Sequence, residues 1–235
     1  MIQDSAGSGL SAPADSAAPG TADSEGPGTE QKIFEAALDV FSRKGHEGAR
    51  MQEIADVAGI NRALLHYYFR SKRQLYETCL GHCFKRFMQA LGPKLSDTRS
   101  FADALGAYID GYIDYIRDHR EVALLMLNEN LSGGTLLGEH LELAFESGTA
   151  PQRIMEDRIR AAIEDGEIRA VDPKHTLLTI VSACLFFFVA LPTVSHLHPQ
   201  AREDFDAFVE ARKRHVFDLL FNGLAREGDA GEGEA

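Results

Sequence analysis

Cysteine is scarce in this sequence of 235 residues, which has three cysteines, an odd number. Their spacing forms no disulfide framework, so the composition argues against a secreted, disulfide-stabilised scaffold and indicates a reducing cytoplasm. No basic segment followed by an apolar run stands near the first residue, so we expect no signal peptide. The length is sufficient to bury a core without disulfides or a structural metal.

Long apolar runs are also few. The longest is 177–191, which only Thr179 and Ser182 interrupt. A bilayer-spanning helix needs about 20 apolar residues. We therefore expect no membrane partner, and we expect this segment to be a helix buried all round, in the core or in a subunit interface.

Alternating strand patterns and internal repeats are absent from the sequence, whereas apolar residues after position 30 recur with the period of a helix. The pattern predicts an all-α protein. Capping residues, glycines and prolines place the expected helices at 30–44, 51–58, 61–68, 71–92, 100–119, 121–131, from about 137, from 151 to Gly166, 173–194 and 201–224. The segment His196–Gln200 is expected to be a loop.

Positive charge is in deficit, since 24 Lys and Arg face 36 Asp and Glu and the formal net charge is −12. The deficit is uneven. Residues 1–31 contain five acidic residues and no base, whereas residues 32–76 contain eight basic and five acidic residues. Within 62–73 there are four basic residues and no acid, which indicates a local basic surface.

Residues 49–72 have the pattern of a helix-turn-helix. A short apolar-periodic helix is followed by Ala58-Gly59 and by a second short helix that ends in aromatic and basic residues. Such a unit lays its second helix in the DNA major groove while neighbouring groups hold phosphates. We therefore predict that the chain binds double-stranded DNA at an operator.

Eight side chains of this unit are candidates for DNA contact. Phosphate contacts suit Arg50, Tyr67 and Lys72, because helix N-termini, hydroxyls and ammonium groups all bind phosphate oxygens. Gln52 and Arg62 have the donors for bidentate contacts with adenine and guanine, and Leu64 can pack on a thymine methyl. The candidates are Arg50, Gln52, Asn61, Arg62, Leu64, His66, Tyr67 and Lys72. Leu65, Tyr68 and Phe69 are expected to face inward.

These motifs resemble the DNA-binding domain of the tetracycline-repressor (TetR) family. The matching pieces are IlePheGluAlaAlaLeuAspValPhe (33–41), IleAlaAspValAlaGlyIleAsn (54–61), LeuHisTyrTyrPhe (65–69) and SerLysArgGlnLeuTyr (71–76). The resemblance implies a homodimer on a near-palindromic operator, usually a repressor, that a small-molecule effector releases. Two positions depart from the family, which usually has Thr or Ser at Arg50 and Tyr at His66.

The composition and the resemblance together predict four regions. These are a disordered tail (1–29), the helix-turn-helix domain (30–76), a helical effector-binding and dimerisation domain (77–225) and a disordered acidic tail (226–235). The helices at 173–194 and 201–224 are expected to form the dimer interface, because the first is too apolar to face water.

An effector cavity lined by aromatic and methionine side chains would suit a bulky apolar molecule. An ordinary core fits the same pattern equally well. The candidate lining residues are Phe84, Phe87, Met88, Tyr108, Tyr112, Tyr115, Met126, Asn130, Met155, Ile159 and Phe187.

Cys79, His82 and Cys83 lie at helical spacing on one face. They suggest either a metal or thiol sensor or, as we prefer, two buried thiols beside a polar histidine. No nucleophile elbow, phosphate loop or zinc-protease motif occurs in the sequence. We therefore expect no enzymatic activity, no cofactor and no metal. The competing hypothesis is a carrier or enzyme with a vestigial helix-turn-helix.

Overall fold

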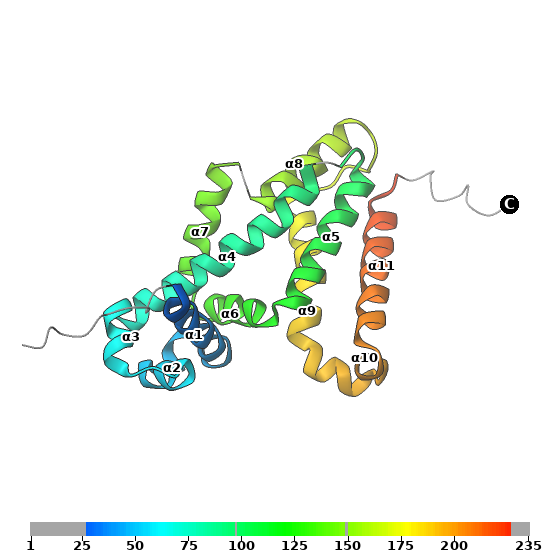
Figure 1. Cartoon of the computed structure of the whole chain (residues 1–235). Helices are drawn as coiled ribbons and strands as arrows, with labels where there is room; N and C mark the ends of the chain where they lie inside the picture. The colour runs from blue at the N-terminus through cyan, green and yellow to red at the C-terminus, as the bar shows by residue number, and fades with distance from the viewer. Residues whose placement is uncertain (1–26, 97, 149, 227–235) are drawn as a thin grey trace, which may run out of the picture.

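The computed structural model describes residues 27–96, 98–148 and 150–226, and these form helices joined by short connections (Figure 1). The expected all-α class is confirmed. The predicted tails fall largely on residues 1–26 and 227–235, which lie outside the described residues. The helices are α1 (Pro27–Gly48), α2 (Met51–Ala58), α3 (Arg62–Tyr68), α4 (Lys72–Ser96), α5 (Phe101–Asp118), α6 (Arg120–Leu131), α7 (Thr135–Glu146), α8 (Pro151–Glu164), α9 (Pro173–Leu197), α10 (Gln200–Glu203) and α11 (Phe205–Leu224).

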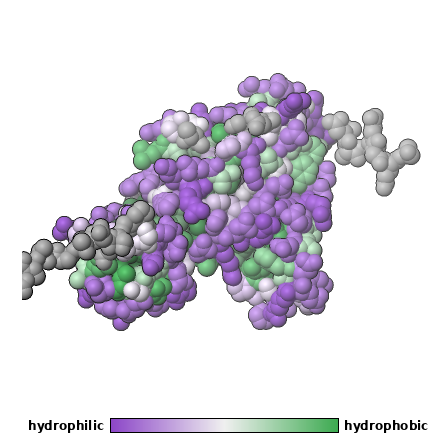
Figure 2. Space-filling view, viewed as in Figure 1, coloured by the Kyte–Doolittle hydropathy of each residue, from purple (hydrophilic) through white to green (hydrophobic). Residues whose placement is uncertain are grey.

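The helices α1–α3 form a small head, and α4 runs from this head into a larger body (Figure 1). The body centres on α5, which packs against α4, α8, α9 and α11. The head rests on the body mainly through α1 and α6. In Figure 2 the head projects as a lobe from a mainly hydrophilic surface. The head and the α9–α11 pair therefore lie at opposite sides of the molecule.

The capping residues in the sequence predicted most of the helix starts correctly. The side chains of Asn61, Ser100 and Asp172 accept hydrogen bonds from backbone N–H groups three residues later, at 2.8, 3.1 and 2.9 Å. Gly59 ends α2 with φ 68°, a conformation that glycine adopts without steric cost. The starts of α3, α5 and α9 are therefore confirmed.

Two of the predicted helix ends are wrong. The fourth helix does not end at Gly92-Pro93 but continues to Ser96, because Leu91 and Leu95 share one buried face on either side of the proline. Burial of these side chains outweighs the hydrogen bond that Pro93 removes. The ninth helix continues beyond the predicted end at 194 to Leu197, and it takes in part of the expected loop at His196–Gln200.

The last predicted helix, 201–224, is two helices. Asp204 interrupts it, and its carboxylate accepts a hydrogen bond from the Ala207 backbone N–H at 2.9 Å, which begins α11. Aspartate favours such a cap over a helix interior position. The seventh helix begins at Thr135, slightly before the expected position of about 137.

The helix α9 is not buried all round within the chain. Leu177, Ile180, Cys184, Phe187 and Phe188 face the core, whereas Leu178 and Phe186 are 61% and 67% exposed. In length and apolarity α9 would suffice to cross a membrane, but only 28% of its most apolar 18-residue window is buried. One apolar face of α9 is thus left uncovered by the described chain.

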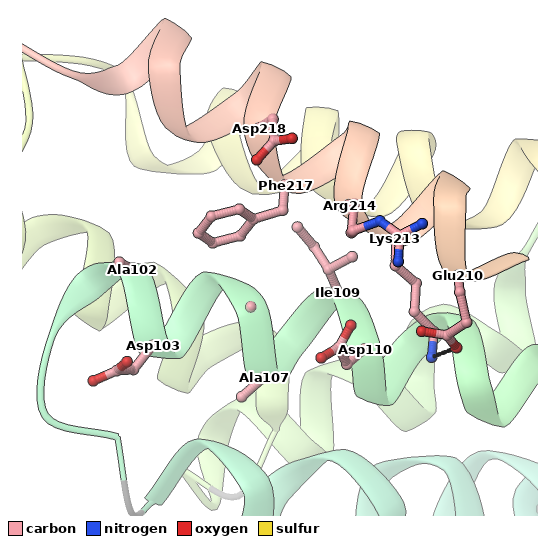
Figure 3. Close-up of a pocket in the computed structure, with 11 residues that line it drawn as sticks. Ala102, Asp103, Ala107, Ile109, Asp110, Glu210, Lys213, Arg214, Phe217 and Asp218 are labelled. Carbon is pink, nitrogen blue, oxygen red and sulfur yellow. Dashed lines mark hydrogen bonds and ion pairs between the residues drawn. The ribbon is translucent and has the colours of Figure 1, made fainter. Parts of the chain in front are cut away.

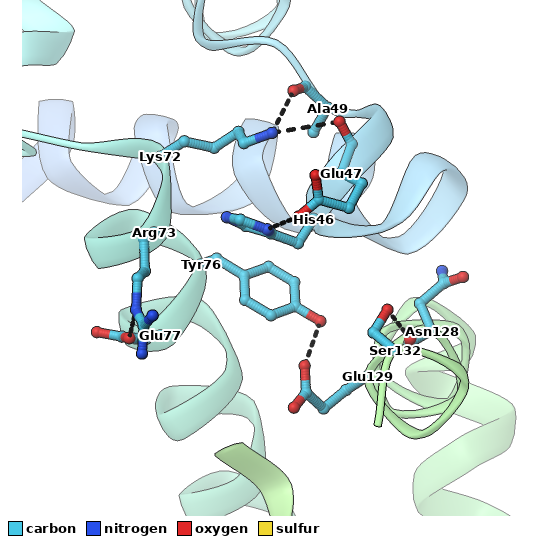
Figure 4. Close-up of polar contacts among 10 residues, drawn as sticks. All are labelled: His46, Glu47, Ala49, Lys72, Arg73, Tyr76, Glu77, Asn128, Glu129 and Ser132. Atoms are coloured by element: carbon cyan, nitrogen blue, oxygen red, sulfur yellow. Dashed lines mark hydrogen bonds and ion pairs between the residues drawn. The ribbon is translucent and has the colours of Figure 1, made fainter. Parts of the chain in front are cut away.

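A buried carboxylate connects three helices beneath the head (Figure 4). Glu129, on α6, accepts hydrogen bonds at 3.0 Å from the Tyr76 hydroxyl on α4 and from the Leu136 backbone N–H at the start of α7. Burial, and secondarily the neighbouring carboxylate, raises the pKa of Tyr76 above its usual range. The hydroxyl therefore remains a donor at every physiological pH.

We predict that Tyr76→Phe costs about 1–3 kcal/mol of unfolding free energy, because it removes a donor from a buried charged acceptor. Urea unfolding monitored by circular dichroism would measure this. Tyr108→Phe is the matched control, because the Tyr108 hydroxyl is buried without a hydrogen-bond partner among the described residues. That variant should be equally or more stable than the wild type, and a similar loss in both variants would contradict the role given to Tyr76.

Candidate nucleic-acid interface

The helices α2 and α3 are held together by their apolar sides. Ile54 and Ala55 of α2 and Leu65 of α3 are fully buried, and Phe69 follows α3 into the core. Tyr68 is partly buried against this core. The predicted inward set of Leu65, Tyr68 and Phe69 is thereby confirmed, and the opposite side of both helices faces solvent.

On α2, the structure places Arg50 and Gln52 at the exposed N-terminal end. Arg50 occupies the N-cap position without a side-chain cap hydrogen bond, as expected from the departure at this position. The Gln52 side-chain amide donates to Asp56 at 2.8 Å. The second amide hydrogen and the side-chain oxygen of Gln52 remain available for a base.

On α3, Arg62 and Tyr67 are exposed, and Tyr67 retains 77% of its surface. Leu64 and His66 are half-buried. The Arg62 Nε donates to the His66 Nε2 at 3.3 Å, so these two candidates already form a pair on the helix surface. The Asn61 side-chain oxygen is occupied as the α3 cap, and its amide nitrogen is the group left for a base or phosphate.

Lys72 has a structural role that the sequence did not show (Figure 4). Its ammonium donates to the backbone oxygens of Glu47 and Ala49, both at 3.2 Å. Lys72 thus ties the start of α4 to the end of α1 and to the residue that follows it. An ammonium has three donors, so one remains for a phosphate.

The head is also tied to the body by Asn128 of α6. Its side-chain amide donates to the Ser42 backbone oxygen in α1 at 2.8 Å. Close by, α1 is kinked at Gly45, which has φ 65°. Sequence reasoning missed Asn128, because a single polar residue on a short apolar helix carries no signal of a contact 86 residues away in the chain.

Basic residues of the head fall into two groups. Arg43, Lys44 and Arg73 form ion pairs with Asp39, Glu53 and Glu77 at 2.6–2.7 Å. By contrast, no ion pair joins Arg50, Arg62 or Arg70 to another described residue. Arg70 lies between α3 and α4 and was not among the predicted contacts, although the acid-free run 62–73 contains it. These three exposed arginines give the head an uncompensated positive surface.

The predicted effector residues do not surround an open cavity. Most are packed in the core, where Phe87 contacts the rings of Tyr112 and Tyr115 at centroid distances of 5.0 and 5.2 Å. Asn130 is exposed, and its amide donates to the Met126 backbone oxygen. Phe187 lines a cavity that lies between α9 and α11.

A larger cavity, of about 640 Å³, lies between α5 and α11 (Figure 3). Its most buried charged group is Lys213, which forms ion pairs at 2.6 Å with Asp114 and Glu210. Desolvation raises the pKa of the Asp110 carboxyl at the edge of the same cavity. The lining is acidic on balance, with Asp103, Asp110, Glu210 and Asp218 against Lys213 and Arg214.

Cys79 and Cys83 are buried, and His82 is exposed with its ring 4.5 Å from that of Phe34. Burial raises the pKa of the Cys83 thiol to about 12 and that of Cys79 above its usual range. Among the described residues there is no cluster of three or more metal-ligating side chains. The arrangement favours two packed thiols over a metal or redox site.

Comparison with known proteins identifies the fold family. Residues 33–79 match the family of bacterial regulatory proteins, tetR family, and residues 102–220 match the tetracyclin repressor-like C-terminal domain. The second match alone spans half of the chain. The chain belongs to the TetR family. It is therefore a DNA-binding transcriptional regulator, and α1–α3 with the start of α4 are its DNA-binding head.

Individual members of the TetR family are similar to this chain in sequence or in fold. The chain is 30% identical to the transcriptional repressor SCO4008 of Streptomyces coelicolor, over 72% of this chain and 82% of that protein. It is 29% identical to the repressor NicS of Pseudomonas putida, over 84% and 93%. The regulator SCO4942 of Streptomyces coelicolor shares the fold with a TM-score of 0.64 at 23% identity, over 85% and 99% of the two chains.

We predict that the thiols of this TetR-family protein do not react with dithionitrobenzoate at pH 8 in the folded state. With the pKa of Cys83 and Cys184 raised to about 12, about one thiol in ten thousand is ionised at that pH. All three should react at once in guanidinium chloride. Rapid reaction of two thiols in the native protein would instead support a sensor at Cys79 and Cys83.

Proposed function

We propose that this chain is a dimeric, cytoplasmic repressor that binds a near-palindromic operator and that a small-molecule effector releases. The observation that carries the proposal is the set of exposed arginines without carboxylate partners at α2, α3 and the turn that follows α3. Arg50, Arg62 and Arg70 form no ion pair with a carboxylate among the described residues, and Tyr67 of α3 is exposed. Phosphate groups of the DNA backbone would neutralise the charges of these arginines.

In this proposal Arg50, Tyr67, Arg70 and Lys72 hold the phosphate backbone, which sets the register of the head on DNA. The base-facing group is Gln52, Asn61, Arg62, Leu64 and His66. Arg62 contacts guanine through its terminal nitrogens, and Gln52 contacts adenine through its second amide hydrogen and its oxygen. The bonds to His66 and Asp56 hold these two side chains on the helix surface before DNA binds.

Dimerisation is supported by the uncovered apolar face of α9 and the neighbouring part of α11. Leu178 on α9 and Leu219 on α11 are 61% and 66% exposed, and the start of α9 meets the end of α11 around a shared cavity. Two copies joined at this face would bury both leucines. The two α3 helices would then need a separation of about 34–36 Å, or a multiple, to enter successive major grooves.

Release by an effector requires that the effector bind the non-operator conformation more tightly than the operator-bound one. The buried aromatic cluster around Phe87 and Tyr112 is the candidate region. Tyr108 lies next to it with an unpaired hydroxyl that could bind a polar atom of the effector. Because the rings of this cluster pack against one another, the effector would have to displace side chains to enter.

Replacement of single basic residues should separate phosphate contacts from base contacts. Lys72→Ala should weaken binding to every sequence and lower the salt slope of log K by about 1, whereas Arg62→Ala should relax preference at one operator position. Binding titrations on selected and random duplexes at several salt concentrations would measure both effects.

Lys85→Ala is the matched control, because Lys85 is an exposed lysine of α4 located in the body. It should leave the salt slope unchanged. Thermal melting would confirm that Lys72→Ala keeps its head folded despite losing two backbone contacts. If no sequence binds more tightly than random DNA at about 0.15 M salt, the repressor proposal is wrong.

Leu178→Glu combined with Leu219→Glu should convert a dimer to a monomer, because each carboxylate would be buried unpaired in the interface. Light scattering should give twice the chain mass of 25.8 kDa for the wild type and a single chain mass for the variant. Leu143→Glu serves as the control, since Leu143 is similarly exposed on α7. A monomeric wild type would refute the dimer.

A further inference from the structure

A cavity of about 330 Å³, within the size range of small-molecule pockets, lies at the junction of the head and the body. It is bounded by the end of α1, the start of α4 and the connection between α6 and α7. None of its lining residues belongs to α2, α3, α9 or α11. The cavity is therefore separate from the proposed DNA-binding surface and from the proposed dimer face. We call it the junction cavity.

One end of the junction cavity holds a buried carboxylate without a cationic partner. Glu129 is 5% exposed, and its hydrogen bonds come from two uncharged donors, the Tyr76 hydroxyl and the Leu136 backbone N–H. No ion pair joins Glu129 to a basic residue of the described chain. The positive end of the α7 dipole offsets part of its charge. Each carboxylate oxygen accepts two hydrogen bonds, so lone pairs remain for a cation that would balance the rest.

The other end holds a ring nitrogen without a partner. The His46 Nδ1 lies 2.9 Å from a carboxylate oxygen of Glu47, whose pKa is lowered by this hydrogen bond. An ionised carboxylate only accepts, so Nδ1 donates and the Nε2 of the neutral ring carries a lone pair. This Nε2 is buried and has no hydrogen-bond partner among the described residues. It is therefore a second free acceptor in the wall of the cavity.

The other polar groups of the cavity keep this preference for donors. The Ser132 hydroxyl donates to the Asn128 backbone oxygen at 2.8 Å, which leaves its lone pairs for a ligand. Arg73 also lines the cavity, but its guanidinium is paired with Glu77 at 2.6 Å. The lining thus offers several acceptors and no cation without a counterion, which complements a positively charged ligand with N–H groups.

The two sets of acceptors are separated by an aromatic ring, and Figure 4 shows Tyr76 between His46 and Glu129. The ring centroids of His46 and Tyr76 are 5.1 Å apart, and the Tyr76 hydroxyl lies 3.0 Å from Glu129 at the far end of the ring. We propose that the junction cavity binds a short linear diamine. One ammonium donates to the Glu129 carboxylate, the other to the His46 Nε2 and Glu47, and the alkyl chain lies along the Tyr76 ring.

A diamine in this position connects the head to the body. His46 belongs to α1 of the head and Glu129 to α6 of the body, so both ammonium groups are satisfied only while these helices keep their present arrangement. The ligand therefore favours this orientation of the head over others. Glu47 and Thr135 at the edge of the cavity are exposed, which leaves a route from solvent. Binding needs no DNA, so this proposal can fail or hold independently of the repressor function.

Isothermal titration of the full chain with putrescine, a butane chain with an ammonium at each end, tests the site in the absence of DNA. Binding should saturate with a Kd below about 1 mM at about 0.15 M salt. Butylamine has one ammonium and the terminal butanediol has none. Each should bind at least about tenfold more weakly than putrescine, because charge-assisted hydrogen bonds are lost.

Substitutions locate the bound diamine. Glu129→Gln should weaken putrescine by about tenfold or more, because it removes the buried charge. His46→Phe keeps a ring beside Tyr76 but removes the Nε2 acceptor, and it should weaken binding by about fivefold. Glu142→Gln is the matched control, because Glu142 is an exposed carboxylate of α7 outside the cavity. It should bind putrescine as the wild type does.

Any of three results would overturn the proposal: no saturable binding of putrescine, equal binding of butanediol, or unchanged affinity in folded Glu129→Gln. Tighter binding of succinate than of putrescine would also overturn it and assign the cavity to an anion held by Arg73. Should Glu129→Gln fail to fold, Ser132→Lys decides, because Ser132 is exposed at the edge of the cavity and its replacement supplies an ammonium there. Putrescine should then bind at least about tenfold more weakly, and unchanged affinity would place the ligand elsewhere.

Discussion

The carbonyl groups at the end of α1 are the constraint on which the position of the head depends. The last turn of a helix leaves carbonyls without intrahelical donors. Here α1 ends where the head, α4 and α6 meet, and the donors come from both neighbours. Asn128 of α6 reaches Ser42, and Lys72 of α4 reaches Glu47 and Ala49. Because α2 begins at Met51, directly after this segment, these contacts hold the chain where the DNA-binding helices start.

The bridge at Glu129 extends the same junction into the body. Its carboxylate joins Tyr76 at the start of α4 to the first turn of α7, so the helices beneath the head share one buried polar group. A conformational change that shifts α6 must alter both this bridge and the Asn128 contact. An effector would therefore act on the head by favouring one set of these hydrogen bonds over another.

Much of the fold was readable from the sequence, because caps and periodicity are local. The N-cap residues predicted the starts of α3, α5 and α9, and these are Asn61, Ser100 and Asp172. The side chains of α3 that face the core followed from their helical spacing. The predicted helix end at Pro93 was wrong, because the cost of a proline is local whereas the burial of Leu91 and Leu95 depends on tertiary packing. Asp204 was missed as a helix start because the apolar period continues through it.

The sequence predicted the kind of site, a DNA-binding surface, but not the contacts that its side chains make within the protein. Charge counting located the basic surface, and the register identified the exposed face of α3. The pairing of Arg62 with His66 and the use of Lys72 as a cap both depend on residues brought together by folding. A linear sequence cannot show which arginines are left without a carboxylate, and that distinction separates the arginines proposed to face DNA from Arg43.

The uneven charge of the chain has a kinetic consequence. Residues 32–76 are net basic while the chain as a whole is strongly acidic. The head projects from one side of the molecule (Figure 1). Such a charge dipole rotates the approaching protein in the field of DNA, so that encounters with the head foremost are attracted and those with the body foremost are repelled. The acidic residues of the body weaken the overall attraction to DNA, but they also shorten the time that the protein needs to approach DNA with its head foremost.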